Sequence, residues 1–211
     1  QDMQILIAAE RDRRASSELT RRLMLPYVDV PNMLFGSFQA LLDPRVDRAR
    51  YPAALERLRK YTGREPGHEP ITKLAMDRST ERFGETGLTG PWTAEVEQNL
   101  GNSQRYLHGI RDLFVKSGLK GYEKDLKTLE SQVTDYDAWV RKEILPRARK
   151  TNLLPPEIYA DNLKNVGVKM EPQALIDRAV VGFVQTRDEM QSLARIIAKE
   201  RGLASSDYKD V

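Results

Sequence analysis

The stretch from Tyr122 to Ile144 places the strongest constraint on the fold of this chain. Its apolar side chains recur in mostly alternating steps of four and three residues, at Tyr122, Leu126, Leu129, Val133, Tyr136, Val140 and Ile144. This spacing places them on one side of an α-helix, whose remaining sides carry mostly charged residues. Such a helix would be about 33 Å long, and Pro146 cannot continue it, because proline lacks the amide hydrogen. A helix with one apolar side needs other helices to pack against.

The rest of the chain is typical of further helices separated by proline and glycine. Prolines such as Pro31 stand where a helix would begin, because the missing amide hydrogen costs nothing in the first turn. Glycines such as Gly63 stand where a helix would end. We interpret Asn102 and Ser103 as an N-terminal cap that starts a new helix. Together these signals predict helices over residues 3–25, 31–42, 52–61, 70–84, 91–101, 103–118, 122–144, 156–166 and 172–201.

No segment alternates apolar and polar residues over a length that would make a strand. We therefore predict an all-α fold, a multi-helix bundle of about eight helices. Two of these helices, residues 122–144 and 172–201, are expected to be long. With 211 residues and 40% hydrophobic side chains, the chain has enough apolar mass for a core. The weakest part of the pattern, from Arg147 to Leu154, predicts a seam between two subdomains.

The charges are numerous but well mixed. The net charge is +3, from 34 basic and 31 acidic residues, and no run of 18 apolar residues is long enough for a transmembrane helix. Arginines are densest in the first helix, where Glu10, Asp12 and Glu18 lie among them. We interpret this segment as a salt-bridged helix surface rather than a phosphate-binding patch, and we expect no nucleic-acid partner.

The residues that carry enzyme chemistry do not form a recognisable motif. The chain has no cysteine and only two histidines, His68 and His108. The His-Glu-x-x-His motif of zinc peptidases is absent. We therefore expect His68 to lie in a loop and His108 to be a surface or half-buried residue of a helix. Asp135 and Asp137 are two positions apart and face different sides of a helix. An acid–base pair from distant segments cannot be seen in one sequence, and we assign no catalytic, cofactor-binding or metal-ligating residue.

Several short segments, taken in order, resemble the N-terminal half of the bacterial domain-of-unknown-function 885 family. They are residues 25–31 (LPYVDVP), 55–63 (LERLRKYTG), 65–67 (EPG), 90–92 (GPW) with Glu95 and Val96, 118–122 (GLKGY), 136–147 (YDAWVRKEILPR) and 154–159 (LPPEIY). The likeness covers nearly the whole chain. One departure is His68, which stands where the family is expected to have an aromatic residue.

The resemblance implies that residues 1–211 are the helical N-terminal region of a larger chain. Members of the family are commonly exported, periplasmic or lipid-anchored, and often lipoproteins. The family is similar to helical zinc metallopeptidases, and its zinc segment contains His-Glu and a following Pro-Gly-His. That segment is expected beyond Val211, so no zinc ligand maps onto this chain, and zinc is expected only in the full-length protein.

The resemblance leads to one hypothesis for the function and leaves others open. The first is a non-catalytic helical portion of a zinc-dependent peptidase-like hydrolase, with the C-terminal half of the same protein and a peptide substrate as partners. The second is a helical protein-binding or scaffold module without enzymatic activity. The third is nucleic-acid binding through the arginine-rich first helix. A helical half without its partner exposes apolar faces, which would also allow a homodimer.

Overall fold

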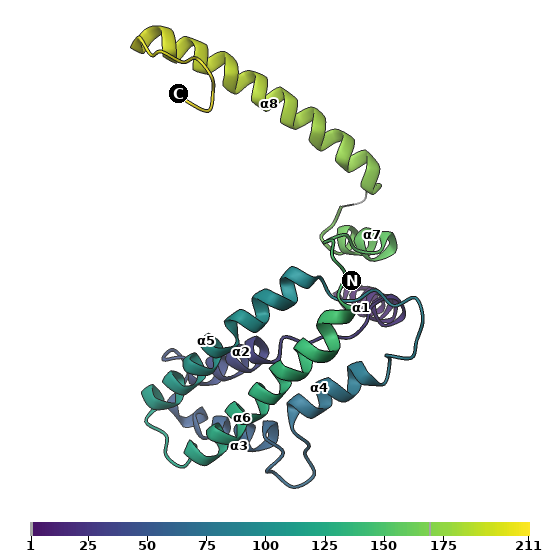
Figure 1. Ribbon diagram of the computed structural model, residues 1–211, viewed down its shortest axis with the longest axis vertical. Helices are drawn as coiled ribbons and strands as arrows, with labels where there is room; N and C mark the ends of the chain where they lie inside the picture. The colour runs from purple at the N-terminus through teal and green to yellow at the C-terminus, as the bar shows by residue number, and fades with distance from the viewer. Residues whose placement is uncertain (1, 169) are drawn as a thin grey trace. The chain divides into compact units, whose positions relative to one another are not determined.

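The computed structural model describes residues 2–168 and 170–211, which form eight α-helices and no β-sheet (Figure 1). The all-α prediction is confirmed. The chain divides into two compact units, Gln1–Pro155 and Pro156–Val211. The first unit contains six of the helices: α1 (Asp2–Leu23), α2 (Val30–Leu42), α3 (Pro52–Tyr61), α4 (Ile71–Thr80), α5 (Thr93–Ser117) and α6 (Glu123–Trp139). The second contains α7 (Pro156–Asn165) and α8 (Pro172–Arg201).

The apolar side of α6 is the centre of the first unit. Each residue of the predicted stripe from Leu126 to Ile144 is buried, and only Tyr122 is partly exposed. Helices α3, α4 and α5 contact α6, and α2 packs mainly against α5. The same core contains buried side chains of α2, α3 and α5, such as Phe38, Leu58, Ile110 and Phe114. Full burial of a large apolar side chain contributes about 1.5–3 kcal/mol, so the buried stripe contributes substantially to the stability of this unit.

Helix α5 corrects one prediction from the sequence. Asn102 and Ser103 do not begin a new helix, because α5 runs without a break from Thr93 to Ser117. The apolar spacing explains this result: Val96, Leu107, Ile110 and Phe114 keep one helical period on both sides of the expected break. Ser103 lies on this same inner side and is completely buried.

The end of α6 also differs from the prediction. The α-helix ends at Trp139, and residues Val140–Ile144 form a π-helical turn, in which the Leu145 N–H donates to the Val140 carbonyl five residues back. A proline ring clashes with the carbonyl four residues before it, and Pro146 follows directly after Leu145. The wider turn opens the helix at this point while Val140 and Ile144 both stay buried.

The segment after α6 is fixed to the start of α5 by backbone contacts. The Arg149 N–H donates to the Pro91 carbonyl at 2.9 Å, and the Thr93 N–H donates to the Arg149 carbonyl at 2.9 Å. Gly90, which comes directly before Pro91, is packed so tightly that an added Cβ would overlap the Arg147 carbonyl. Only a glycine allows this close approach of two backbones.

The second unit consists of α7, α8 and a short returning tail. α7 contacts α8, and the tail after Gly202 folds back along the C-terminal half of α8. The Gln191 side chain holds the tail, because its Nε2 donates to the Ser206 carbonyl at 2.6 Å and its Oε1 accepts from the Tyr208 N–H at 3.3 Å. Ala194 and Ala198 are buried in this half of α8. The division after Pro155 lies next to the seam predicted at residues 147–154.

We expect Gly90→Ala to lower the free energy of unfolding by about 1–3 kcal/mol, because the new methyl group must push two backbone segments apart. Urea denaturation followed by tryptophan fluorescence measures this change. Gly84→Ala is the matched control, since its Cβ would meet nothing within 4 Å, and we expect a change below about 0.5 kcal/mol. Equal stability of the two variants would contradict the tight contact at Gly90.

Candidate functional site

The first unit contains a cluster of polar side chains next to its apolar core, which we call the polar cluster. Its members come from three parts of the chain: the segment between α1 and α2, helix α5, and the end of α6. Each one interacts electrostatically or by a hydrogen bond with at least one other member. The members are Tyr27, Asp29, Glu95, Asn99, Ser103, Tyr136 and Asp137.

Helix geometry brings the α5 members together. Glu95, Asn99 and Ser103 are four residues apart, which places them on one side of the helix, one turn after another. Exposure falls along this row, from the exposed Glu95 through the partly buried Asn99 to the fully buried Ser103. The row therefore leads from the protein surface inward.

Side chains of other helices hold the segment between α1 and α2 in place by donating hydrogen bonds to its backbone carbonyls. The Ser79 hydroxyl donates to the Pro26 carbonyl at 2.7 Å, and the Tyr136 hydroxyl donates to the Val28 carbonyl at 2.7 Å. The Asp29 carboxylate caps α2 by accepting from the Asn32 N–H at 3.3 Å. Tyr27 is then positioned so that its hydroxyl accepts from Asn99 Nδ2 at 3.3 Å.

Asp137 is the carboxyl group that lies deepest in the polar cluster. It is 7% exposed, and burial raises its pKa above the ordinary value. The nearby Ser103 hydroxyl and the Arg141 guanidinium oppose this rise, while the negative charge of Asp29 adds to it. Apart from Asp137, whose pKa it lowers, the buried Ser103 hydroxyl has no hydrogen-bond partner among the described residues. The negative charge of the Asp137 carboxylate is therefore only partly compensated by the groups around it.

The two tyrosines of the polar cluster are held in the neutral form. Burial raises the pKa of Tyr27 to about 12, and the charges of Asp29, Glu95 and Asp137 act in the same direction. Burial also raises the pKa of Tyr136, whose ring stacks on Trp139 at 5.7 Å between centroids. Neutral phenols are hydrogen-bond donors and acceptors, so the cluster offers carboxylates, hydroxyls and an amide at one place. These groups can bind and orient a polar or cationic ligand.

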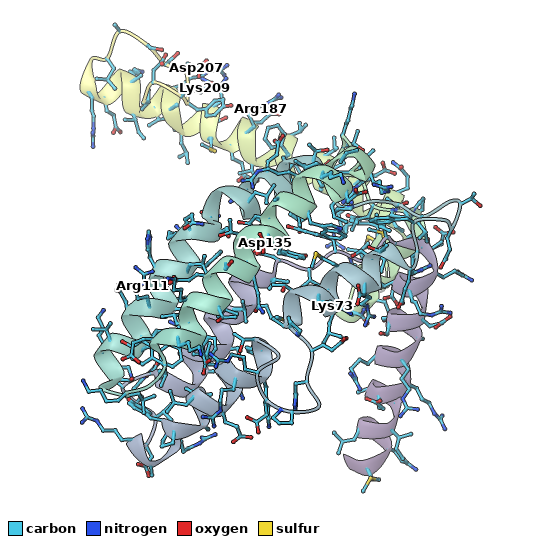
Figure 2. The ribbon with its side chains drawn as sticks, turned by 60° about the horizontal axis from the view of Figure 1, so that its bottom comes forward. Lys73, Arg111, Asp135, Arg187, Asp207 and Lys209 are labelled. Carbon is cyan, nitrogen blue, oxygen red and sulfur yellow. The ribbon has the colours of Figure 1, made fainter. Side chains whose placement is uncertain are left out.

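Sequence reasoning did not identify the polar cluster. Asp135 and Asp137 face different sides of α6, as predicted: Asp135 is exposed (Figure 2) and Asp137 is buried. The carboxylate that acts on Asp137 comes instead from Asp29, on a distant segment. The one available signal was Asp137 itself, which directly follows a stripe residue and so lies at the edge of the buried side.

The predicted positions of the two histidines are confirmed. His68 lies exposed in the loop before α4, with its Nδ1 3.3 Å from the Pro66 carbonyl, and His108 is exposed on α5. Within residues 2–168 and 170–211, no three His, Asp or Glu side chains are grouped so that they could hold a metal ion. Zinc in a longer protein stays a prediction.

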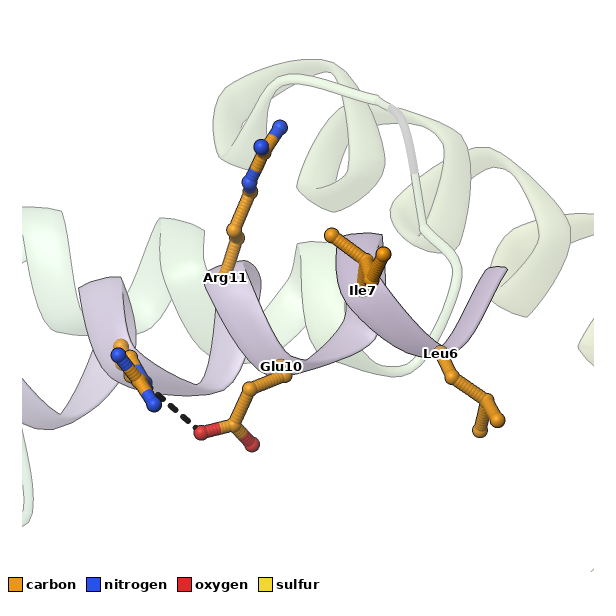
Figure 3. A pocket seen from close by; sticks show the side chains of 5 residues that line it. Leu6, Ile7, Glu10 and Arg11 are labelled. Carbon is orange, nitrogen blue, oxygen red and sulfur yellow. Dashed lines mark hydrogen bonds and ion pairs between the residues drawn. The ribbon is translucent and has the colours of Figure 1, made fainter. Parts of the chain in front are cut away.

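Arginines of α1 form ion pairs with glutamates of the same helix, as the sequence suggested. Arg13 and Arg14 both bond to Glu10, and Arg21 bonds to Glu18. Figure 3 shows a hollow beside the N-terminal half of this helix, lined by Leu6, Ile7, Glu10, Arg11 and Arg14. It is shallow and open to solvent, and its apolar lining comes from residues that are themselves exposed.

The second unit has a larger exposed apolar surface, which we call the open face of α8. Ile176, Val180 and Phe183 are 49%, 57% and 65% exposed, although their spacing puts them on one side of the helix. The tail covers the continuation of this side at Ala194 and Ala198 but leaves the N-terminal half uncovered. Among the described helices, none combines the length and apolar character that would let it cross a membrane.

No protein-family model matches the chain, and no curated protein or solved structure matches it significantly. The family resemblance of the sequence segments therefore stays a prediction.

We expect Asp137→Asn to stabilise the protein near pH 7 by about 1 kcal/mol, because it removes a buried, partly compensated charge. The pKa of Asp137 is raised above its ordinary value of 3.8. Below that value the Asp137 carboxyl is uncharged in both the folded and the unfolded chain and costs no stability. As the pH rises through the raised pKa, the group ionises inside the protein and the free energy of unfolding falls. The gain from Asp137→Asn should disappear near pH 3 in urea denaturation followed by tryptophan fluorescence.

Asp135→Asn is the control for this measurement, because Asp135 is exposed on the same helix. We expect its effect to stay below about 0.5 kcal/mol at either pH. A loss of stability in Asp137→Asn near neutral pH, relative to this control, would show that the Asp137 carboxylate is well compensated.

Proposed function

We propose that this chain is a helical, non-catalytic portion of a zinc-dependent peptidase-like hydrolase. In this proposal the first unit lines one side of a substrate cleft, and the metal is held by polypeptide outside these 211 residues. A metallopeptidase needs a metal-activated water and a polarised carbonyl group, and that part of the chemistry is assigned to the other polypeptide. The C-terminal half of the same protein is the proposed partner.

The observation that carries the proposal is the open face of α8. A helix that exposes Ile176, Val180 and Phe183 along one side leaves apolar area in water, which is unfavourable by about 25 cal/mol per Å². Exposed apolar patches of this kind are typical of surfaces that pack against another part of a protein. The ordered sequence segments that resemble the peptidase-like family suggest which polypeptide that is.

The polar cluster is consistent with a cleft wall. A peptide presents amide hydrogens, carbonyl oxygens and charged side chains, and the cluster offers acceptors and donors that pair with each of them. Its members lie on α5, on α6 and on the segment that Val28 anchors to Tyr136. Groups on rigid elements position a substrate better than groups on mobile loops.

A helical protein-binding or scaffold module without enzymatic activity is the second candidate, and the open face of α8 supports it equally well. The two candidates differ in what the covering polypeptide contributes. In the first candidate the covering polypeptide supplies the metal site of a hydrolase. In the second it is only a binding partner.

Metal content and peptide hydrolysis separate the two candidates. We expect this chain alone to retain no stoichiometric zinc after dialysis, measured by mass spectrometry of the metal, and to cleave no peptides from a mixed library. The longer protein should cleave peptides, and a chelator should abolish the cleavage. Stoichiometric zinc on these residues alone would contradict the proposal, and a longer protein without chelator-sensitive cleavage would favour the scaffold module.

A substitution on the open face of α8 tests the packing itself. Phe183→Glu should change the stability of this chain by less than about 0.5 kcal/mol, because Phe183 is already exposed. In the longer protein the same change should destabilise the assembled state by roughly 2–4 kcal/mol, since it buries a charge in an apolar contact. Gln185→Glu, on the opposite side of α8, is the control, and equal effects of the two variants in the longer protein would argue against packing through this face.

A further inference from the structure

Helix α8 carries a heptad pattern along one side, which we call the heptad side. Its positions recur in alternating steps of four and three residues, and all but one of them are apolar. They are Ile176, Val180, Phe183, Arg187, Met190, Ala194 and Ile197. This spacing is typical of a helix that packs lengthwise against another helix, as in a coiled coil. The open face of α8 is the N-terminal half of the heptad side.

The single charged position of the heptad side fixes the direction in which a second copy of α8 can pair with the first. In a parallel pair, Arg187 of one copy would face Arg187 of the other, and two like charges repel each other in an apolar contact. In an antiparallel pair centred on residue 185, Arg187 faces Phe183 of the second copy instead. A guanidinium group stacks favourably on an aromatic ring, so the antiparallel direction is favoured.

The other layers of this antiparallel pair match the two halves of the heptad side in size. Ile176 of one copy faces Ala194 of the second copy, so a large side chain meets a small one. Val180 faces Met190, whose unbranched side chain adapts to the space it fills. Facing positions that combine large and small residues interdigitate well. The open face of one α8 therefore fits the C-terminal half of the heptad side of another, which makes a second copy of this chain a complementary partner.

The tail, residues 203–211, lies on the half of the heptad side that such a pair requires. It returns beside the C-terminal half of α8 (Figure 1), where the Gln191 side chain bonds to the Ser206 carbonyl and to the Tyr208 N–H. Ala194 is only 4% exposed in this half, whereas Ile176, its facing position in the pair, is 49% exposed. A second α8 can reach Ala194 only when the tail has left.

The tail is held weakly enough to leave. Only Ser205 and Tyr208 are partly buried, and the other residues of the tail are exposed. The two hydrogen bonds to Gln191 each contribute modestly to holding it, because the same groups bond to water when they are released. Release therefore exchanges few apolar contacts and two weak hydrogen bonds for a longer apolar side of α8.

We propose that the tail is a strap that keeps α8 from pairing with α8 of a second copy of this chain. Release of the tail from Gln191 allows an antiparallel dimer along the heptad side. The tail and the second copy compete for the same half of α8, so the dimer forms only to the extent that the tail is released. The proposal does not depend on the peptidase-like function. In the longer protein, the second copy and the C-terminal half would compete for the open face of α8.

Gln191→Ala tests the strap, because it removes both hydrogen bonds from the side chain to the tail. We expect the Tyr208 amide to exchange with deuterated solvent at least about tenfold faster than in the unchanged chain, measured by NMR. The Leu203 amide is the internal control, because it donates to the Ala198 carbonyl at the end of α8 and should keep its exchange rate. An unchanged Tyr208 rate would overturn the proposal, since Gln191 would then not hold the tail.

Sedimentation velocity of the same variant tests the dimer. We expect Gln191→Ala to dimerise with a dissociation constant at least about tenfold lower than that of the unchanged chain. Gln185→Ala, on the opposite side of α8, is the matched control and should behave as the unchanged chain. Adding Val180→Glu to Gln191→Ala should restore the monomer, because it places a charge in an apolar layer. A chain that releases its tail but associates no more than Gln185→Ala would overturn the proposal.

Crosslinking tests the direction of the pair, and the chain has no cysteine of its own to interfere. Ile176→Cys and Ala194→Cys, each combined with Gln191→Ala, are oxidised separately and as a mixture. We expect disulfide-linked dimers only in the mixture, because a disulfide requires Cα atoms within about 7 Å and only the antiparallel pair brings these two positions together. Crosslinking of each variant with itself would show a parallel pair and contradict the proposed arrangement.

Discussion

The burial of one side of α6 is the interaction on which the first unit depends. Leu129, Val133, Val140 and Ile144 are almost completely hidden from solvent, and every neighbouring helix contributes to hiding them. The same packing brings Tyr136 under the segment between α1 and α2, where its hydroxyl meets the Val28 carbonyl. The polar cluster is therefore a product of the core: its groups converge because apolar residues one turn away must be buried.

This arrangement has an electrostatic consequence. Asp137 directly follows a core residue, so the helix that buries Tyr136 also removes the neighbouring carboxyl group from water. A sequence selected for stability alone would place an uncharged side chain there. Perturbed ionisable groups cluster at functional sites more often than elsewhere, which is why the polar cluster is a better candidate than the exposed histidines or the hollow beside α1.

The sequence predicted the fold class and the buried stripe of α6, because both follow from the spacing of apolar residues along one helix. It failed at α5, where the capping tendency of Asn102 and Ser103 was weighed above a helical period that continues from Val96 to Phe114. Its only sign of the polar cluster was Asp137 next to a stripe residue, because Asp29, Glu95 and Asp137 belong to distant segments that meet only in the folded chain. The apolar side of α8 could be predicted from the periodicity of its residues. The sequence did not show that the tail covers only the C-terminal half of this side.

The backbone bonds between Arg149 and the start of α5 decide where the chain can be cut. Proteases require an extended, freely moving segment, and Arg149 is held on both its amide and its carbonyl. Lys150 is exposed, and the residues from Thr151 to Leu153 that follow it are exposed and without regular structure. Limited trypsin digestion should therefore spare Arg147 and Arg149, cut first after Lys150, and release the two units as separate folded fragments.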